Sequence, residues 1–199
     1  MAEQPTVILL GGAPGTGKTT LANLLVRELG LGHHISTGFI RAAVRHLLPE
    51  REAQALSMDS FDVWETLPDL SPNGTSAVFQ GVMHQASILK PSIEACVRRA
   101  AAEGIGLVLE GTHVIPGLLD LTGVKGTLLC VLDVTDREAL RSRAMSDSHT
   151  QRKLTEEQLN SLIQLQSDLV AQAHALDCTV ITNDNIDDAL EQLSALIVR

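Results

Sequence analysis

Short apolar runs alternate with longer amphipathic stretches along the 199 residues of the chain. Five short runs predict strands, and most of them are continuous in apolar residues instead of alternating with polar ones, as a parallel strand covered on both faces requires. They comprise residues 6–10, 33–36, 107–109, 127–134 and 179–182. Because helical patterns separate them, the sequence predicts an α/β fold of three layers, with about five parallel strands and helices on both faces.

Apolar residues at helical spacing predict the connections between these strands. The predicted helices cover residues 17–29, 39–48, 77–103, 155–176 and 185–197. Gly30 is a stop signal for the first helix, and Pro91 is expected to interrupt or kink the third. Thr155 and Gln158 fit a capping box at the start of the fourth.

Residues 49–77 are irregular and contain Pro68, the turn sequence of residues 71–74 and the single tryptophan. That composition indicates an insertion over the sheet and not a linker between domains. A chain of this length is too short for two ordinary domains. We therefore expect one domain over residues 1–199, with a helical insertion at roughly residues 39–100.

Directly after the first predicted strand, residues 12–19 form a complete G-x-x-x-x-G-K-[ST] phosphate loop. A strand, a glycine loop and a helix in succession place backbone N–H groups and a helix N-terminus around a polyphosphate. Lys18 is expected to reach the β- and γ-phosphates, and the Thr19 hydroxyl to bind Mg²⁺. The alternative is a glycine-rich turn without a ligand. The predicted nucleotide-binding residues are Gly12, Ala13, Pro14, Gly15, Thr16, Gly17, Lys18, Thr19 and Thr20.

Charge and composition narrow the possible partners. The formal net charge is −9, which disfavours a general nucleic-acid binder, and the scarcity of aromatic residues disfavours base stacking. The three cysteines are far apart and lack metal-ligand spacing, so we expect reduced thiols and a cytoplasmic protein. No apolar stretch approaches a membrane span, and residues 1–5 lack the basic start of a secretion signal. A small molecule is the expected partner, and the sequence leaves the oligomeric state open.

Polar residues follow the predicted strands, at the edge where a doubly wound sheet binds its ligand. Glu110 ends an apolar run, where a carboxylate can contact a metal ion or handle the proton of an acceptor, or simply cap the turn. His113 is a candidate for substrate binding or a structural residue. Thr37 follows the second strand as a substrate-binding candidate. Asn183 follows the fifth, where analogy with P-loop kinases places the adenine site.

Arg41 and Arg45 are four residues apart on a predicted helix, so they share one face. A planar guanidinium matches a carboxylate or a phosphate through two hydrogen bonds. The pair therefore predicts a binding site for an anionic acceptor.

Five of the fifteen lysines and arginines fall between residues 137 and 153, next to a polar stretch at residues 146–150. We expect a lid at roughly residues 141–153 that lays Arg141 and Arg143 across the transferred phosphoryl group and excludes water. The alternative is solvated surface charge at a helix end.

Three segments together resemble the 2-phosphoglycerate kinases and their P-loop relatives. They are residues 8–12 with the loop, Ser36-Thr37 followed by Arg41, and residues 109–117, Leu-Glu-Gly-Thr-His-Val-Ile-Pro-Gly. The likeness covers nearly the whole chain. It implies a P-loop nucleoside-kinase-like fold with a substrate-covering insertion and an arginine-bearing lid. It also implies ATP and Mg²⁺ as cofactors, and conversion of 2-phosphoglycerate to 2,3-bisphosphoglycerate.

The chain departs from that family at Gly38, where relatives usually carry an aspartate suited to orient or deprotonate the acceptor hydroxyl. The proton then passes to Glu110 or Asp59, matters little in a loose transition state, or the activity has changed. Ser36-Thr37-Gly38 also looks like the acceptor segment of adenylate kinases, so a nucleotide acceptor is one alternative. A nucleotide-binding regulatory protein without transfer activity is another.

Overall fold

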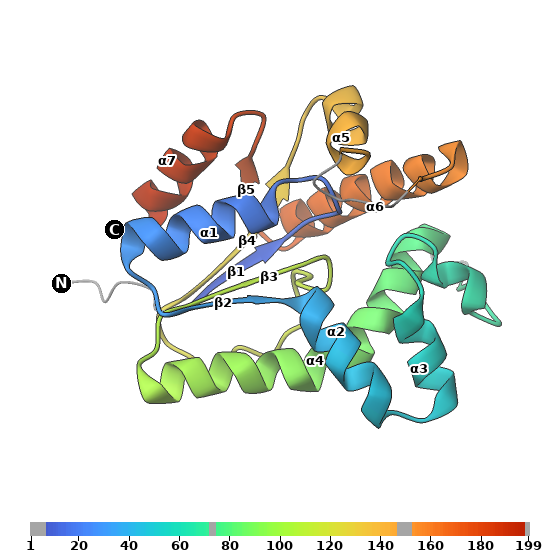
Figure 1. Ribbon diagram of the computed structural model, residues 1–199, viewed down its shortest axis with the longest axis horizontal. Coiled ribbons are helices and arrows are strands. Elements are labelled where there is room, and N and C mark those ends of the chain that lie inside the picture. Colours follow the sequence, from blue (N-terminus) through green and yellow to red (C-terminus); the bar gives the residue numbers. More distant parts are fainter. Residues whose placement is uncertain (1–6, 72–74, 147–152, 198–199) are drawn as a thin grey trace.

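The computed structural model describes residues 7–71, 75–146 and 153–197. In it, five strands form a sheet in the order β2-β3-β1-β4-β5 (Figure 1). The strands are β1 (Val7–Gly11), β2 (His33–Ser36), β3 (Leu107–Glu110), β4 (Thr127–Asp133) and β5 (Thr179–Thr182). Every neighbouring pair is parallel, which confirms the predicted parallel sheet.

Helices connect the strands with bounds close to those that the apolar spacing predicts. They are α1 (Lys18–Leu29), α2 (Thr37–Val44), η1 (Arg45–Leu47), α3 (Glu50–Ser57), η2 (Val63–Thr66), α4 (Ala77–Glu103), α5 (Arg137–Ala144), α6 (Glu156–Ala175) and α7 (Ile186–Ile197). Helix α4 continues unbroken through Pro91, so Pro91 does not interrupt it. The capping box predicted at Thr155 and Gln158 is present. No helix in the described ranges is long and apolar enough to cross a membrane.

Helices cover both faces of the sheet and bury its inner strands β1 and β3 completely. Ile8 and Leu10 of β1 pack with the apolar residues of α1 and α7. Val7 and Leu9 point to the other face and pack with the second half of α4. Helix α6 continues that layer beside β4 and the first half of α4. The three-layer architecture is confirmed (Figure 1).

The segment from α2 to η2 projects beyond the carboxyl ends of the strands, together with the first half of α4 (Figure 1). The second half of α4 instead covers the sheet, where Leu89, Ile93 and Val97 are fully buried. The part of the chain that lies beyond the sheet edge is therefore shorter than the predicted insertion of residues 39–100. That the whole chain forms one domain stays a prediction.

Helix α2 begins two residues earlier than the apolar spacing predicts, because Ser36 caps it: the Ser36 hydroxyl accepts a hydrogen bond from the Gly38 N–H at 3.2 Å. The α-helix ends at Val44 and tightens into η1. Leu48 is extended, as a residue before proline prefers to be. Arg41 therefore lies on an α-helical turn near the sheet edge, and Arg45 lies one turn further from it.

Candidate active site

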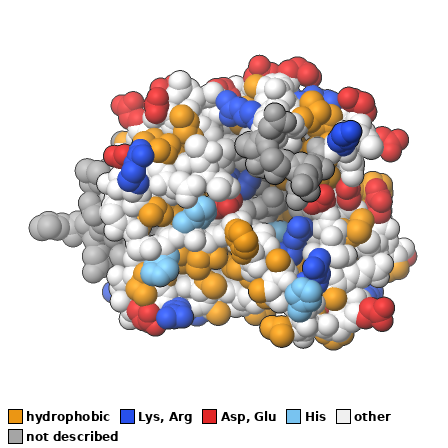
Figure 2. Space-filling model, in the orientation of Figure 1, with side chains coloured by type: hydrophobic (Ala, Val, Ile, Leu, Met, Phe, Trp, Pro, Cys, Tyr) orange, Lys and Arg blue, Asp and Glu red, His pale blue; other side chains and the backbone are white. Residues whose placement is uncertain are grey.

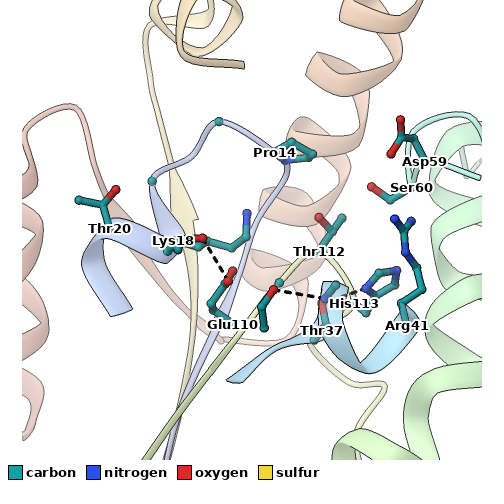
Figure 3. A pocket seen from close by; sticks show the side chains of 16 residues that line it. Pro14, Lys18, Thr20, Thr37, Arg41, Asp59, Ser60, Glu110, Thr112 and His113 are labelled. Carbon is teal, nitrogen blue, oxygen red and sulfur yellow. Dashed lines mark hydrogen bonds between the residues drawn. The ribbon is translucent and has the colours of Figure 1, made fainter. Parts of the chain in front are cut away.

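A cavity of about 400 Å³ opens at the carboxyl ends of β1, β2 and β3. Its lining comes from four segments that are distant in sequence: the phosphate loop and the start of α1, the start of α2, residues 59–60, and residues 110–113. In Figure 3, Lys18 and Glu110 lie at one end, and Arg41, Asp59 and Ser60 lie at the other. The sheet order explains this meeting, because β3 lies between β1 and β2.

The phosphate loop takes its shape from glycines with positive φ angles. Gly12, Gly15 and Gly17 have φ angles of 142°, 87° and 85°. A Cβ atom at Gly17 would lie 2.3 Å from Nδ2 of Asn183, so space as well as backbone geometry requires glycine there. The loop thus follows the conformation that its motif predicts.

Lys18 is almost completely buried beneath this loop. Its ammonium donates hydrogen bonds to the Ala13 carbonyl at 2.8 Å and to the Thr16 hydroxyl at 3.3 Å. Burial lowers the pKa of Lys18 to about 8, and the negative charge of Glu110 opposes that shift. A polyphosphate in the cavity would supply the charge that this partly desolvated ammonium lacks.

Glu110 lies at the end of β3 in register with Leu10 of β1, directly beside the phosphate loop. The Thr19 hydroxyl donates a hydrogen bond to Oε1 of Glu110 at 3.1 Å. His34 Nε2 lies 3.6 Å from the same oxygen. Glu110 is 3 % exposed, so this carboxylate is held in place at the cavity wall.

Thr19 and Glu110 fit a magnesium ion that is bound mainly through a nucleotide. No group of three or more His, Cys, Asp or Glu residues in the described part of the chain could hold a metal by itself. Mg²⁺ characteristically uses one or two protein oxygens and completes its shell with phosphate oxygens and water. A hydroxyl and a carboxylate in mutual contact beside a phosphate loop supply such a pair.

Arg41, Asp59 and Ser60 line the end of the cavity away from the phosphate loop (Figure 3). The Arg41 guanidinium donates a hydrogen bond to the Met58 carbonyl at 2.7 Å, which joins α2 to the segment after α3. The remaining N–H groups of a guanidinium match an anionic oxygen pair. Arg45 is not among the residues that line this cavity, so the structure brings only one of the two predicted arginines to it.

Thr37 and His113 meet in the cavity wall between the two ends. The Thr37 hydroxyl lies 3.0 Å from His113 Nδ1, and His113 Nε2 lies 2.8 Å from Oε1 of Gln85. Burial, with the positive charges of Arg41 and Lys18, lowers the pKa of His113 to about 3. His113 therefore lines the cavity as a neutral ring whose two nitrogens both bond within the protein.

Two buried side-chain amides hold the phosphate loop from behind. Oε1 of Gln166 on α6 accepts a hydrogen bond from the Ala13 N–H at 2.8 Å, and its Nε2 donates to the Leu132 carbonyl. Nδ2 of Asn183 donates to the Thr16 carbonyl at 2.7 Å. The periodicity of α6 gives Gln166 no sign of this role, because an amide in an amphipathic helix is usually at the surface.

Asn183 also lines a second cavity of about 410 Å³ on the other side of the phosphate loop, with Gly17, Thr20 and Arg143. Arg143 donates hydrogen bonds of 2.7 Å to the carbonyls of Asn183 and Asp184. The predicted adenine-site residue and one predicted lid arginine thus meet here. The role of neither is tested by this arrangement.

Arg141 points to neither of these cavities. Its guanidinium contacts Glu156 at 3.1 Å and Glu138 at 3.6 Å, and it donates to Asn160 on α6. Residues 147–152 of the predicted lid lie outside the described residues. The lid, and the closing role of Arg141 and Arg143, stay predictions.

The fold and the site together define a P-loop protein with the architecture of small-molecule kinases. A gluconokinase from Sinorhizobium meliloti superimposes with a TM-score of 0.58 at 16% identity, over 98% of this chain and 95% of that one. A family model described as zeta toxin matches residues 1–66. These similarities confirm the predicted fold class.

Sequence similarity points to a particular group of relatives. The chain is 27% identical over 192 residues to a 2-phosphoglycerate kinase from Pyrococcus horikoshii, covering 95% of this chain and 63% of that protein. It is 29% identical over 205 residues to the 2-phosphoglycerate kinase from Methanopyrus kandleri, covering 98% and 61%. The resemblance seen in the motifs is confirmed, and the chain spans about three fifths of the length of these relatives.

Proposed function

We propose that this protein transfers the γ-phosphoryl group of ATP, with Mg²⁺, to a hydroxyl of a small phosphorylated acid, and that 2-phosphoglycerate is the acceptor. The observation that carries the proposal is a single cavity with a phosphate loop at one end and an arginine at the other. A donor phosphate held by Lys18 and an acceptor anion held by Arg41 would face each other across it. The names of the relatives support the choice of acceptor.

The donor end suits a nucleoside triphosphate. Lys18 and the loop N–H groups would bind the β- and γ-phosphates, and Thr19 with Glu110 would hold the magnesium ion, which neutralises charge on the phosphates. The second cavity, beside Asn183 and Arg143, would take the base. Cys96, Cys130 and Cys178 are free thiols, as expected of a protein in the reducing cytoplasm.

The acceptor end suits a small anion with a hydroxyl. Arg41 would hold its phosphate or carboxylate group, and Thr37 lies between Arg41 and the phosphate loop, where the reacting hydroxyl would be. Asp59 lines the acceptor end of the cavity beside Ser60. Its carboxylate could receive the proton that the hydroxyl loses as the phosphoryl group is transferred. Gly38 lines the cavity as well, so the aspartate usual in the relatives has no direct replacement at its own position.

Product formation by the purified protein with Mg-ATP tests the proposal. We expect 2,3-bisphosphoglycerate and ADP in equal amounts from 2-phosphoglycerate, and Lys18→Met should abolish both nucleotide binding and transfer. ATP binding without ADP formation across phosphorylated three-carbon acids, nucleotides and sugars would instead support a nucleotide-binding regulatory protein. Transfer to a nucleoside monophosphate alone would replace the proposed acceptor.

A matched pair of arginines tests the acceptor end. Arg41→Gln should raise the KM for the acceptor at least tenfold while leaving the affinity for ATP unchanged, because its guanidinium lines the cavity far from the loop. Arg45→Gln is the control, since Arg45 lies one turn further along the same segment and outside the cavity lining. Equal effects of the two substitutions would contradict the assignment.

A further inference from the structure

Three side chains form a buried chain of hydrogen bonds behind the acceptor end. Thr37 Oγ1 lies 3.0 Å from His113 Nδ1, and His113 Nε2 lies 2.8 Å from Gln85 Oε1. All three residues are at most 3 % exposed. They come from α2, the segment after β3, and α4, so the chain connects three elements around the cavity.

Gln85 fixes the direction of every hydrogen bond in this chain. Its Nε2 donates to the Ala55 carbonyl at 2.7 Å and to the Met58 carbonyl at 3.1 Å. The opposite amide orientation would set Oε1 against two carbonyl oxygens, so Oε1 must face His113. An amide oxygen only accepts, and His113 Nε2 therefore carries the ring hydrogen.

The tautomer of His113 then determines what Thr37 presents to the cavity. A neutral imidazole with hydrogen on Nε2 has a lone pair on Nδ1, so the Thr37 hydroxyl donates its single hydrogen to His113. The oxygen of Thr37 retains its lone pairs, and Thr37 lines the cavity. A substrate bound there would contact the Thr37 oxygen. This oxygen can accept a hydrogen bond from the substrate but cannot donate one to it.

The surroundings of His113 exclude a role as the base that receives the acceptor proton. The ring is buried between the cationic side chains of Arg41 and Lys18, which together with desolvation lower its pKa to about 3. A protonated ring would also lose the lone pair that binds Thr37. The hydrogen-bond chain therefore orients and does not remove a proton.

The same amide group connects this chain to the arginine. The Met58 carbonyl accepts from Gln85 Nε2 and also from Arg41 Nη1 at 2.7 Å. Gln85 thus sets both the hydrogen-bonding sense of Thr37 and the position of the carbonyl that anchors Arg41. Thr37, which would bind a hydroxyl, and Arg41, which would bind an anion, are therefore held together at the acceptor end.

We propose that Gln85 and His113 are positioning residues that make Thr37 an obligate hydrogen-bond acceptor, so that the site selects molecules carrying a hydroxyl beside an anionic group. The inference rests on the proposed function and deepens it, because it specifies which feature of the acceptor is recognised. A deprotonated oxygen of a second carboxylate or phosphate cannot donate to Thr37 and is disfavoured at that point. A hydroxyl can donate, and its own oxygen then faces the donor phosphate.

The tautomer of His113 is measured without any assumption about activity. Protein labelled with ¹⁵N-histidine gives the protonation state of each ring nitrogen by NMR, and the His113→Asn variant assigns the signals. We expect a neutral ring with hydrogen on Nε2 throughout pH 5.5 to 8, and a mixture of tautomers in Gln85→Leu. A hydrogen on Nδ1, or a charged ring, in the unsubstituted protein would overturn the inference.

Hydroxyl recognition is measured by calorimetry with ADP bound, using 2-phosphoglycerate and 2-phospholactate, which has hydrogen in place of the hydroxyl. The expected preference for 2-phosphoglycerate is about five- to tenfold, the value of one hydrogen bond. Thr37→Val should abolish that preference, and Thr37→Ser should keep it. Ser87→Ala is the control on the same helix as Gln85, with an exposed hydroxyl that bonds only to the Met83 carbonyl among the contacts described.

The outcomes separate the inference from the proposed function. Equal binding of the two compounds, or a preference that survives in Thr37→Val, would overturn hydroxyl selection even if transfer activity is found. Binding of neither compound would overturn the proposed acceptor, and the tautomer measurement then decides the inference. If Gln85→Leu fails to fold, the Thr37 variants and the tautomer in the unsubstituted protein still decide it.

Discussion

At the scale of single residues, Lys18 combines burial with a proposed role, phosphate binding, that needs positive charge. Its pKa is lowered to about 8, because desolvation outweighs the attraction of Glu110. Bound phosphates would raise that pKa again, since an opposite charge favours the protonated amine. At pH 8 about half of the Lys18 side chains are neutral before binding, so we predict that ATP binding takes up about half a proton.

Calorimetry of ATP binding at pH 8 in buffers of different ionisation enthalpy measures this proton uptake. The Lys18→Arg variant is the control, because arginine keeps its charge at every pH of interest. A binding enthalpy that does not depend on the buffer in the unsubstituted protein would contradict the prediction.

Gly38 leads to a prediction about the missing carboxylate. A Cβ atom there would meet only the Ser36 hydroxyl, at 3.4 Å, so a side chain fits at the cavity wall. If the proposed acceptor is correct, Gly38→Asp should raise kcat with 2-phosphoglycerate by about tenfold or more, since a positioned base contributes at least that much. Steady-state kinetics with Gly38→Asn as the uncharged control measures it. A fall in kcat with unchanged stability would indicate a different acceptor.

The positions of residues could be predicted where they depend on neighbours in sequence. The loop motif predicts Lys18 and Thr19 because a strand, a turn and a helix suffice to define their positions. Gln85 and Gln166 were beyond such reasoning, since each amide finds its partners in segments 27 or more residues away. A polar residue on an amphipathic helix gives no sign of whether it faces water or a buried carbonyl.

At the scale of elements, the turn after β3 has to come very close to the start of α2. A Cβ atom at Gly111, where φ is 150°, would lie 1.8 Å from the Thr37 hydroxyl oxygen. Gly111→Ala should therefore displace Thr37, lower the free energy of unfolding by about 1–3 kcal/mol and raise the KM for the acceptor. Urea unfolding and steady-state kinetics measure the two effects.

Gly123→Ala is the matched control for this substitution. Gly123 also has a positive φ, 79°, but no atom lies within 4 Å of an added Cβ. It should cost about 1 kcal/mol from backbone strain and leave the KM unchanged. An acceptor KM that rises equally in both variants would show that Thr37 is not the group displaced.

The strands were more predictable than the segment after β2. Continuous apolar residues identify β1, β3 and β4, whose central positions are apolar because helices cover both faces of the sheet, and β5 is marked by its β-branched residues. Arg41 and Arg45 share a face in an ideal helix, but α2 projects away from the sheet and ends at Val44. Of the two, only Arg41 lines the cavity. How far each helical turn lies from the sheet edge depends on tertiary packing, which the spacing of residues in the sequence does not show.

At the scale of the whole molecule, the neutral His113 makes stability depend on pH. The pKa of His113 is about 3 in the folded protein, against 6.5 in the unfolded chain. Between these values the unfolded chain binds a proton that the folded protein does not, so acid favours unfolding. We predict that the free energy of unfolding falls by about 1.4 kcal/mol per pH unit from pH 6 to pH 4 through this group alone.

Urea unfolding of the unsubstituted protein and of His113→Asn at several pH values isolates that contribution as a difference. The unsubstituted protein should lose free energy of unfolding faster than His113→Asn as the pH falls, so its advantage over the variant should shrink or reverse. His46→Asn, at an exposed position in η1, is the matched control. Parallel pH profiles of the unsubstituted protein and His113→Asn would contradict the prediction. Figure 2 shows charged side chains of both signs on one face of the molecule, and all three proteins share them.

The central place of β1 has a consequence for the newly made chain. Val7 pairs with Leu107 and with Thr127, and the amides that hold the phosphate loop belong to Gln166 and Asn183. The ribosome therefore synthesises the loop early, but the two side chains that hydrogen-bond to it follow more than 150 residues later. A chain that ends before α6 lacks Gln166, whose side-chain oxygen accepts the hydrogen bond from the Ala13 N–H. If ATP binds as proposed, we expect it to stabilise the finished protein more than its shorter precursors.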